Sequence, residues 1–180
     1  MTALTRFLRA EGIVLFSLLS IAAAFGLIPG GQDIHAYIVA GTTEPYANST
    51  AGALDAFLYA PAFTQLLEPL RALPWDVSRA AWMAASLVCL RWLAPVAWPL
   101  LLPLVLVELM AGNVHLLFAA VIVLGFRHPW MWSLVLLTKV TPGIGLLWFA
   151  TRREWRSLAI VAASTTVVVA GSWWIAPHLW

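Results

Sequence analysis

Long apolar runs separated by short polar breaks dominate the pattern along the chain. A helix that crosses a bilayer needs about 20 mostly apolar residues, so these runs predict membrane-spanning helices. We expect residues 1–180 to form a single all-α module, a polytopic transmembrane helical bundle of about seven helices. The expected helices are Gly12–Ile28, Ala56–Leu73, Arg79–Ala94, Pro129–Phe149 and Ser157–Ile175, with two short helices or a re-entrant pair inside Leu93–Phe126.

One long polar segment, residues 30–55, interrupts this pattern. It is rich in Gly, Thr, Asn and Asp, which predicts an extracytoplasmic loop. The periodic positions Ile34, Tyr37 and Ile38 predict a short surface helix within the loop. The first apolar run follows two arginines and resembles a signal sequence, but we expect it to remain an uncleaved helix. Its removal would leave the topology of the later helices unchanged.

The distribution of arginines predicts the orientation of the bundle. Positive residues concentrate in cytoplasmic loops, and the 30–55 loop contains neither Lys nor Arg. We therefore expect a multi-pass protein of the inner (plasma) membrane with a cytoplasmic N-terminus and Asp76 as the N-cap of the third helix. The predicted cytoplasmic set is Arg6, Arg9, Arg71, Arg79, Arg152, Arg153 and Arg156, and the predicted outer set is Arg91 and Arg127.

Composition supports a membrane protein and excludes several other classes. Hydrophobic residues make up 62% and charged residues 10% of the chain, whereas soluble domains have about 45–50% and about 25%. The net charge of +2 comes without a basic tract, which excludes nucleic acid as a partner. The single cysteine excludes an intrachain disulfide, and no His, Cys or Asp cluster has metal-ligand spacing. We expect neither a metal nor another cofactor.

The few polar residues outside the predicted cytoplasmic loops are candidates for function, because charge near lipid is costly. Asp33 and Tyr37 share one face of the predicted surface helix, although Asp33 would also serve as its N-cap. Tyr59 begins the second predicted helix, where an aromatic belt residue is also expected. Asn113 and His115 interrupt apolar sequence, where they either bind a ligand or tie short helices together.

Lys139 is the only lysine in the protein and lies ten residues into a predicted 21-residue helix. That position is about 15 Å from either helix end, and Pro142 removes a backbone hydrogen bond nearby, as is typical of residues that line a cavity. A buried pair with Glu108 is the alternative explanation. Arg91 either contacts a lipid phosphate or anchors the third helix at the membrane interface.

The order of these elements resembles family 87 of the integral-membrane glycosyltransferases. This family has a C-type fold and includes polyprenyl-phosphate-mannose-dependent alpha-1,2-mannosyltransferases. The resemblance implies that the chain corresponds to the N-terminal half of such an enzyme. It rests on Asp33 with Tyr37, on Phe57 with Tyr59 and Pro61, on Gly112 with Asn113, and on Lys139 with Pro142.

By this resemblance, Asp33 is the catalytic base. It takes the proton of an acceptor hydroxyl that attacks the anomeric carbon of a sugar, mannose by the resemblance, held on a polyprenyl phosphate, with inversion. The expected partners are this donor, a lipid or glycan acceptor and membrane lipids. The alternatives are a small membrane carrier or a non-catalytic or partner-dependent half, which would need a second membrane subunit. The implied substrate-binding residues are Tyr37, Tyr59, Arg91, Asn113, His115 and Lys139.

Overall fold

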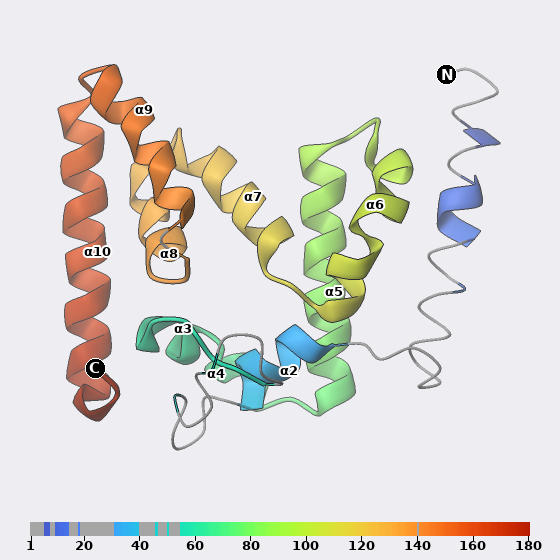
Figure 1. Ribbon diagram of the computed structural model, residues 1–180, viewed down its shortest axis with the longest axis horizontal. Helices are drawn as coiled ribbons and strands as arrows, with labels where there is room; N and C mark the ends of the chain where they lie inside the picture. Colours follow the sequence, from blue (N-terminus) through green and yellow to red (C-terminus); the bar gives the residue numbers. More distant parts are fainter. Residues whose placement is uncertain are drawn as a thin grey trace. The chain divides into compact units, whose positions relative to one another are not determined.

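Helices are the only regular secondary structure in the part of the chain that the computed structural model describes, and no strand occurs there. This confirms the predicted all-α class. The chain divides into two compact units, which are described separately (Figure 1). Unit 1 comprises Met1–His35 and Pro74–Leu117, and unit 2 comprises Ala36–Leu73 and Phe118–Trp180. The described residues are 6–7, 10–14, 18, 31–39, 46, 50, 55–139 and 141–180, so most of the predicted first helix lies outside them.

Unit 1 is built on two helices that pack along each other, α5 and α6 (Figure 1). Leu90 of α5 and both Leu102 and Leu109 of α6 form its buried core. Gly112 ends α6 in the left-handed conformation, with a φ of 74°, as glycine commonly does after a helix. The helices that contribute to this unit are the start of α2 (Gln32–Val39), α5 (Trp75–Leu93), α6 (Trp98–Ala111) and the start of α7 (His115–Gly125).

Unit 2 packs short helices against the longest one, α10. Its core contains Trp132, Val135, Phe149 and Val161, all buried. Besides the ends of α2 and α7, its elements are α3 (Pro61–Leu66), α4 (Glu68–Arg71), the 3₁₀ helix η1 (Pro129–Met131), α8 (Trp132–Leu136), η2 (Thr141–Gly145), α9 (Leu146–Thr151), α10 (Trp155–Ile175) and η3 (Pro177–Leu179).

The segment predicted as the spanning helix Pro129–Phe149 is a helical hairpin instead, and we call it the 129–151 hairpin. Phe126, just before it, has its ring centroid 6.2 Å from that of Trp148 and 5.7 Å from that of Phe149. The chain therefore returns to where it started. The prediction is wrong for two reasons. Pro142 lacks a backbone N–H, and Gly145 at the end of η2 lets the backbone approach the ring of Trp132 on α8.

The second predicted helix, Ala56–Leu73, is also wrong as a membrane span. Helical structure begins only at Pro61, and α3 and α4 have six and four residues, which corresponds to about 9 Å and about 6 Å of length. Arg71 at the end of α4 donates through Nε to the Ile38 carbonyl at 2.9 Å and through Nη2 to the Tyr37 carbonyl at 3.1 Å. Arg71 therefore lies beside α2, and the prediction that a membrane separates it from the 30–55 loop is wrong.

The remaining predicted helices agree better with the structure. Helix α10 reproduces Ser157–Ile175 and is the one described helix that is long and apolar enough to cross a membrane by itself. Residues Leu93–Phe126 contain α6 and α7, and the apolar pair Leu104–Ala111 and His115–Gly125 is bent by 104° at its break. This geometry fits both predicted alternatives, two short helices or a re-entrant pair. Helix α5 starts at Trp75 after the N-cap Pro74, so the prediction of Asp76 as N-cap is wrong. A total of seven spans stays a prediction.

Candidate functional site

In unit 1, the start of α2 packs against the turn between α6 and α7. The backbone N–H of Gly31 donates to the Met110 carbonyl at 2.6 Å. Ile34 fills the space beside Gly112, where an added Cβ would lie 2.8 Å from Ile34 Cγ2. These contacts bring half-buried Asp33, in the first turn of α2, to the turn that contains Asn113. Close packing at Gly112 thus positions the predicted base.

The polar residues of the α6–α7 turn form a linked set. Asn113 Oδ1 accepts the backbone N–H of His115 at 3.3 Å, as a residue that caps a helix start does. His115 Nδ1 lies 2.8 Å from Glu108 Oε2, with the two side chains 50% and 39% exposed. Glu108 therefore has a partner within its own unit. A pair between Glu108 and Lys139 would join the two units and stays a prediction.

Arg79 is a basic residue beside the start of α2, although the sequence predicted it in a cytoplasmic loop. An added Cβ on Gly31 would lie 3.1 Å from Arg79 Cδ and 3.2 Å from the ring of Trp75. The Trp75 ring also packs edge-on against His35, at 5.3 Å between centroids. Trp75 and Arg79 are four residues apart on α5, and this spacing places them on one helix face. The sequence could have indicated the pairing of Trp75 with Arg79 through this spacing. The prediction instead placed Arg79 in a cytoplasmic loop.

Arg91 does not lie beside the start of α2, where Asp33 is. It is exposed on α5, twelve residues after Arg79, which is about 18 Å further along the helix. There it lines an apolar cavity of unit 1. Arg91 therefore lies apart from Arg79, which packs beside Gly31 near the other end of α5.

In unit 2, four rings from α2, α3 and the segment before α3 form what we call the aromatic cluster: Tyr37, Phe57, Tyr59 and Phe63. The hydroxyls of Tyr37 and Tyr59 are 3.2 Å apart, and their rings meet edge-on at 5.3 Å. Tyr46 donates its hydroxyl to the Tyr59 carbonyl at 2.8 Å, and partial burial raises the pKa of Tyr46 above its ordinary value. The structure thus brings the two predicted tyrosines together.

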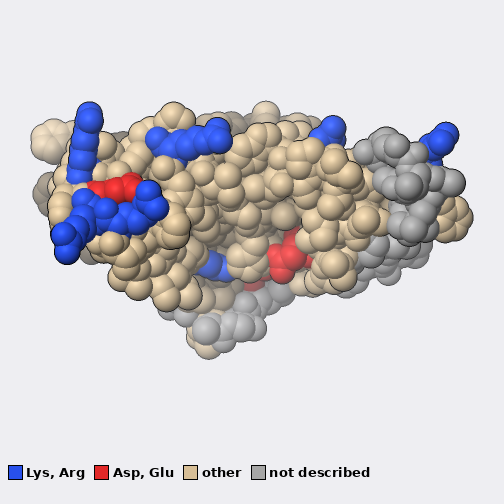
Figure 2. Space-filling view, turned by 90° about the horizontal axis from the view of Figure 1, so that it is seen from above, with Lys and Arg blue, Asp and Glu red and all other residues tan. Residues whose placement is uncertain are grey.

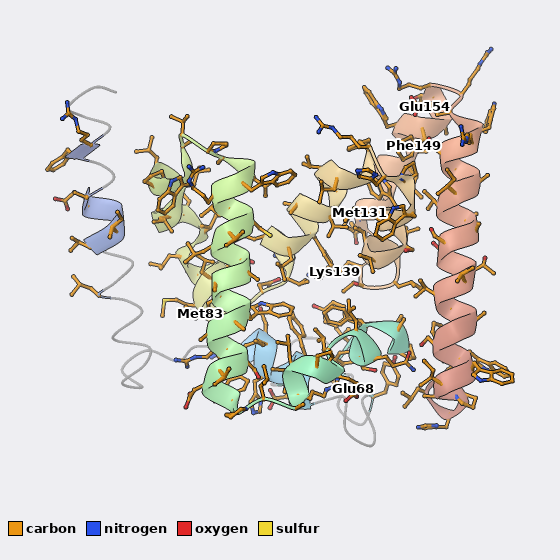
Figure 3. The ribbon with its side chains drawn as sticks, turned by 180° about the vertical axis from the view of Figure 1, so that it is seen from behind. Glu68, Met83, Met131, Lys139, Phe149 and Glu154 are labelled. Atoms are coloured by element: carbon orange, nitrogen blue, oxygen red, sulfur yellow. The ribbon has the colours of Figure 1, made fainter. Side chains whose placement is uncertain are left out.

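Lys139 lies at the turn of the 129–151 hairpin, at the opposite end of the hairpin from Glu154 (Figure 3). The prediction that it is buried in the middle of a continuous helix is wrong, because α8 ends at Leu136. The Ala60 N–H donates to the Leu137 carbonyl at 3.2 Å, so the turn lies against the residue that follows Tyr59. This contact brings half-buried Lys139 to the vicinity of the aromatic cluster.

Arginines gather at the other end of the hairpin, where α9 meets α10. Figure 2 shows basic side chains around an acidic one over the start of α10. Arg152 binds Glu154 at 2.8 Å and covers the Trp148 ring at 5.1 Å from its centroid. Because Phe126 packs on Trp148, the neighbouring Arg127 lies at this same end. The prediction that a membrane separates Arg127 from Arg152 is therefore wrong.

The described residues contain no group of three or more His, Cys, Asp or Glu side chains that could hold a metal ion. The candidate residues of the two units carry carboxylate, amide, imidazole, phenol and ammonium groups. A carboxylate, a tyrosine pair and a lysine are groups that can accept a proton, hold a sugar and stabilise an anion.

Comparison with known families assigns the chain. Residues 57–180 match glycosyltransferase family 87, which is more than half of the sequence. The chain belongs to glycosyltransferase family 87, so it is a transferase that acts on a sugar donor and an acceptor. No curated protein matches the chain, and no solved structure does. The family match includes Tyr59, Asn113 and Lys139 and begins after Asp33 and Tyr37.

Proposed function

We propose that this glycosyltransferase moves a sugar, mannose by the sequence resemblance, from a polyprenyl-phosphate donor to a hydroxyl of a lipid or glycan. The observation that carries the proposal is the course of α2. Asp33 and Tyr37 lie one turn apart on this helix. Tyr37 meets Tyr59 in the aromatic cluster, with the two hydroxyls 3.2 Å apart.

The reaction is a single displacement with inversion. Asp33 takes the proton of the acceptor hydroxyl as its oxygen bonds to the anomeric carbon, and the bond from that carbon to the phosphate oxygen breaks. The departing lipid phosphate is an anion, so the protein must add positive charge around it. Lys139 supplies this charge, while the paired hydroxyls of Tyr37 and Tyr59 bind hydroxyls of the sugar.

We assign to Arg79 the substrate-binding role that the sequence predicted for Arg91. It packs on Gly31, two residues before Asp33, whereas Arg91 is about 18 Å further along α5. Asn113 and His115 complete the acceptor side of the site with one amide and one imidazole. His115 is held by Glu108, which fixes the position of its ring.

The charges of unit 2 support an extracytoplasmic site. Arginines cluster where α10 begins, while Gln65 of α3 donates to the Ser172 carbonyl near the end of α10 at 3.1 Å. Helix α10 has 21 residues, about 31 Å, enough to cross a bilayer. If the arginines face the cytoplasm, as the positive-inside rule predicts, then α3 and the aromatic cluster face the outside.

The first test is transfer of radiolabelled mannose from polyprenyl-phosphate mannose to lipid in membranes that contain this chain. We expect Asp33→Asn to lower the rate by about 100-fold or more, the usual contribution of a positioned base. Lys139→Gln should lower it strongly as well. Asp76→Asn is the matched control, because Asp76 is an exposed acid in the first turn of α5. Equal transfer by the Asp33 and Asp76 variants would contradict the proposal.

A partner-dependent half of such an enzyme is the second candidate. It is favoured by the short helices, since a single described helix meets the criteria for a span by itself. In that case the chain purified from its native membrane should carry a second polytopic subunit, and transfer should require both. A small carrier, the third class, would tolerate Asp33→Asn without loss of transport.

A further inference from the structure

Unit 1 contains a cavity that the proposed transfer reaction does not use. Its volume is about 510 Å³, within the range of roughly 300–1,000 Å³ that is common for ligand sites. Both α5 and α6 contribute to its wall. The lining residues are Ile13, Leu87, Val88, Arg91, Trp98 and Leu102.

The residues that line the cavity comprise one charged residue, Arg91, and five apolar residues. Leu87 and Val88 precede Arg91 by one helical turn on α5, so they lie on the same face of the helix one turn away. Among the residues that the structure describes, Arg91 has no ion-pair partner, and its side chain is exposed. An anionic group bound there would have apolar surface directly behind it.

Two tryptophans near Arg91 indicate its level relative to the headgroups of a bilayer. Trp92 follows Arg91 and is 47% exposed, and Trp98 lines the cavity from the start of α6. Tryptophan concentrates at the headgroup level of a bilayer because its ring is apolar and its N–H is polar. Arg91 also lies within one turn of the end of α5 at Leu93. Charge and tryptophans together place a headgroup at this end and an acyl chain along α5 and α6.

We propose that this cavity binds a phospholipid with an anionic headgroup, with the headgroup on Arg91 and an acyl chain between Leu87, Val88 and Leu102. This lipid is separate from the transfer reaction. Arg91 is about 18 Å along α5 from Arg79, which packs beside the residues that precede Asp33. The inference therefore stands independently of the proposed function.

Native mass spectrometry of the full chain in detergent, titrated with phosphatidylglycerol or phosphatidylcholine of the same acyl chains, tests the site. The intact chain should prefer phosphatidylglycerol. Arg91→Gln should weaken phosphatidylglycerol binding by about fivefold, the effect of one lost charge near a headgroup, and leave phosphatidylcholine binding unchanged. Arg156→Gln is the control for an exposed arginine elsewhere, and it should keep the preference.

The apolar part of the site has its own variant. Val88 is 67% exposed at the cavity, so Val88→Trp should fill the space without disturbing the core, and it should weaken both lipids. Three results would overturn the proposal: an unchanged lipid preference in Arg91→Gln, unchanged binding in Val88→Trp, or competition by millimolar inorganic phosphate, which would indicate a site for free phosphate.

Discussion

Two neighbouring segments of unit 2 have similar length and similar apolar composition but fold differently. Helix α10 is continuous from Trp155 to Ile175, whereas the 129–151 hairpin is divided among η1, α8, η2 and α9. Hydropathy alone predicts a membrane-spanning helix for both. The two segments therefore show how little of the course of a membrane chain hydropathy determines.

The difference lies in a few residues that limit the backbone. In the hairpin, Pro142 is followed by two glycines, Gly143 and Gly145. A Cβ on either glycine would collide with α8, at Leu136 for Gly143 and at Trp132 for Gly145. In α10 the single glycine, Gly171, has no atom within 4 Å of an added Cβ. The glycines of the hairpin allow its two arms to pack closely, whereas Gly171 of α10 packs against no other residue that the structure describes.

The largest expected effect concerns sidedness. In a Cys89→Ser background, cysteines placed at Arg127 and Arg153 should react with a membrane-impermeant maleimide from the same side of sealed vesicles, because the hairpin returns to its start. A cysteine at His178, beyond α10, should react only from the other side. A permeant maleimide should label all three. Labelling of the 127 and 153 positions from opposite sides would show that the segment crosses the membrane.

Gly145→Ala should destabilise the protein, because the new Cβ would meet the ring of Trp132, a fully buried residue of the core. Overpacking of this kind costs about 1–3 kcal/mol. Reversible denaturation of the detergent-solubilised protein, monitored by tryptophan fluorescence, measures the change. A neutral effect would mean that the hairpin arms are less closely packed than the structure shows.

Gly171→Ala should have the smaller effect and the opposite sign. The position lies inside a continuous helix with open space around it. Replacing glycine by alanine in a helix interior contributes about 0.5–1 kcal/mol of stability, because glycine loses more backbone entropy on folding. The same denaturation experiment measures it. Destabilisation here would indicate that another element packs against α10 at Gly171.

The sequence predicted those features that depend on local pattern. The periodic positions Ile34, Tyr37 and Ile38 correspond to α2, and the break at Gly112 separates α6 from α7. The predicted shared face of Asp33 and Tyr37 follows from α2 as observed. Such features require only the helical period and the conformational freedom of glycine.

The features that depend on tertiary packing were not predictable in this way. The return of the 129–151 hairpin requires the contact of Trp132 with Gly145, which no periodicity signals. The hairpin turn contacts Ala60 through Leu137, so Lys139 lies in this turn and not in the middle of a helix. Arg79 was misplaced because its location depended on a second span that does not form.

Helix α2 determines the separation of two residues of the proposed site. Its first half belongs to unit 1 and its second half to unit 2. Asp33 and Tyr37 are four positions apart on the helix, a rise of about 6 Å. The backbone of this short helix thus sets the spacing between the two residues that we propose as proton acceptor and as sugar-binding ring.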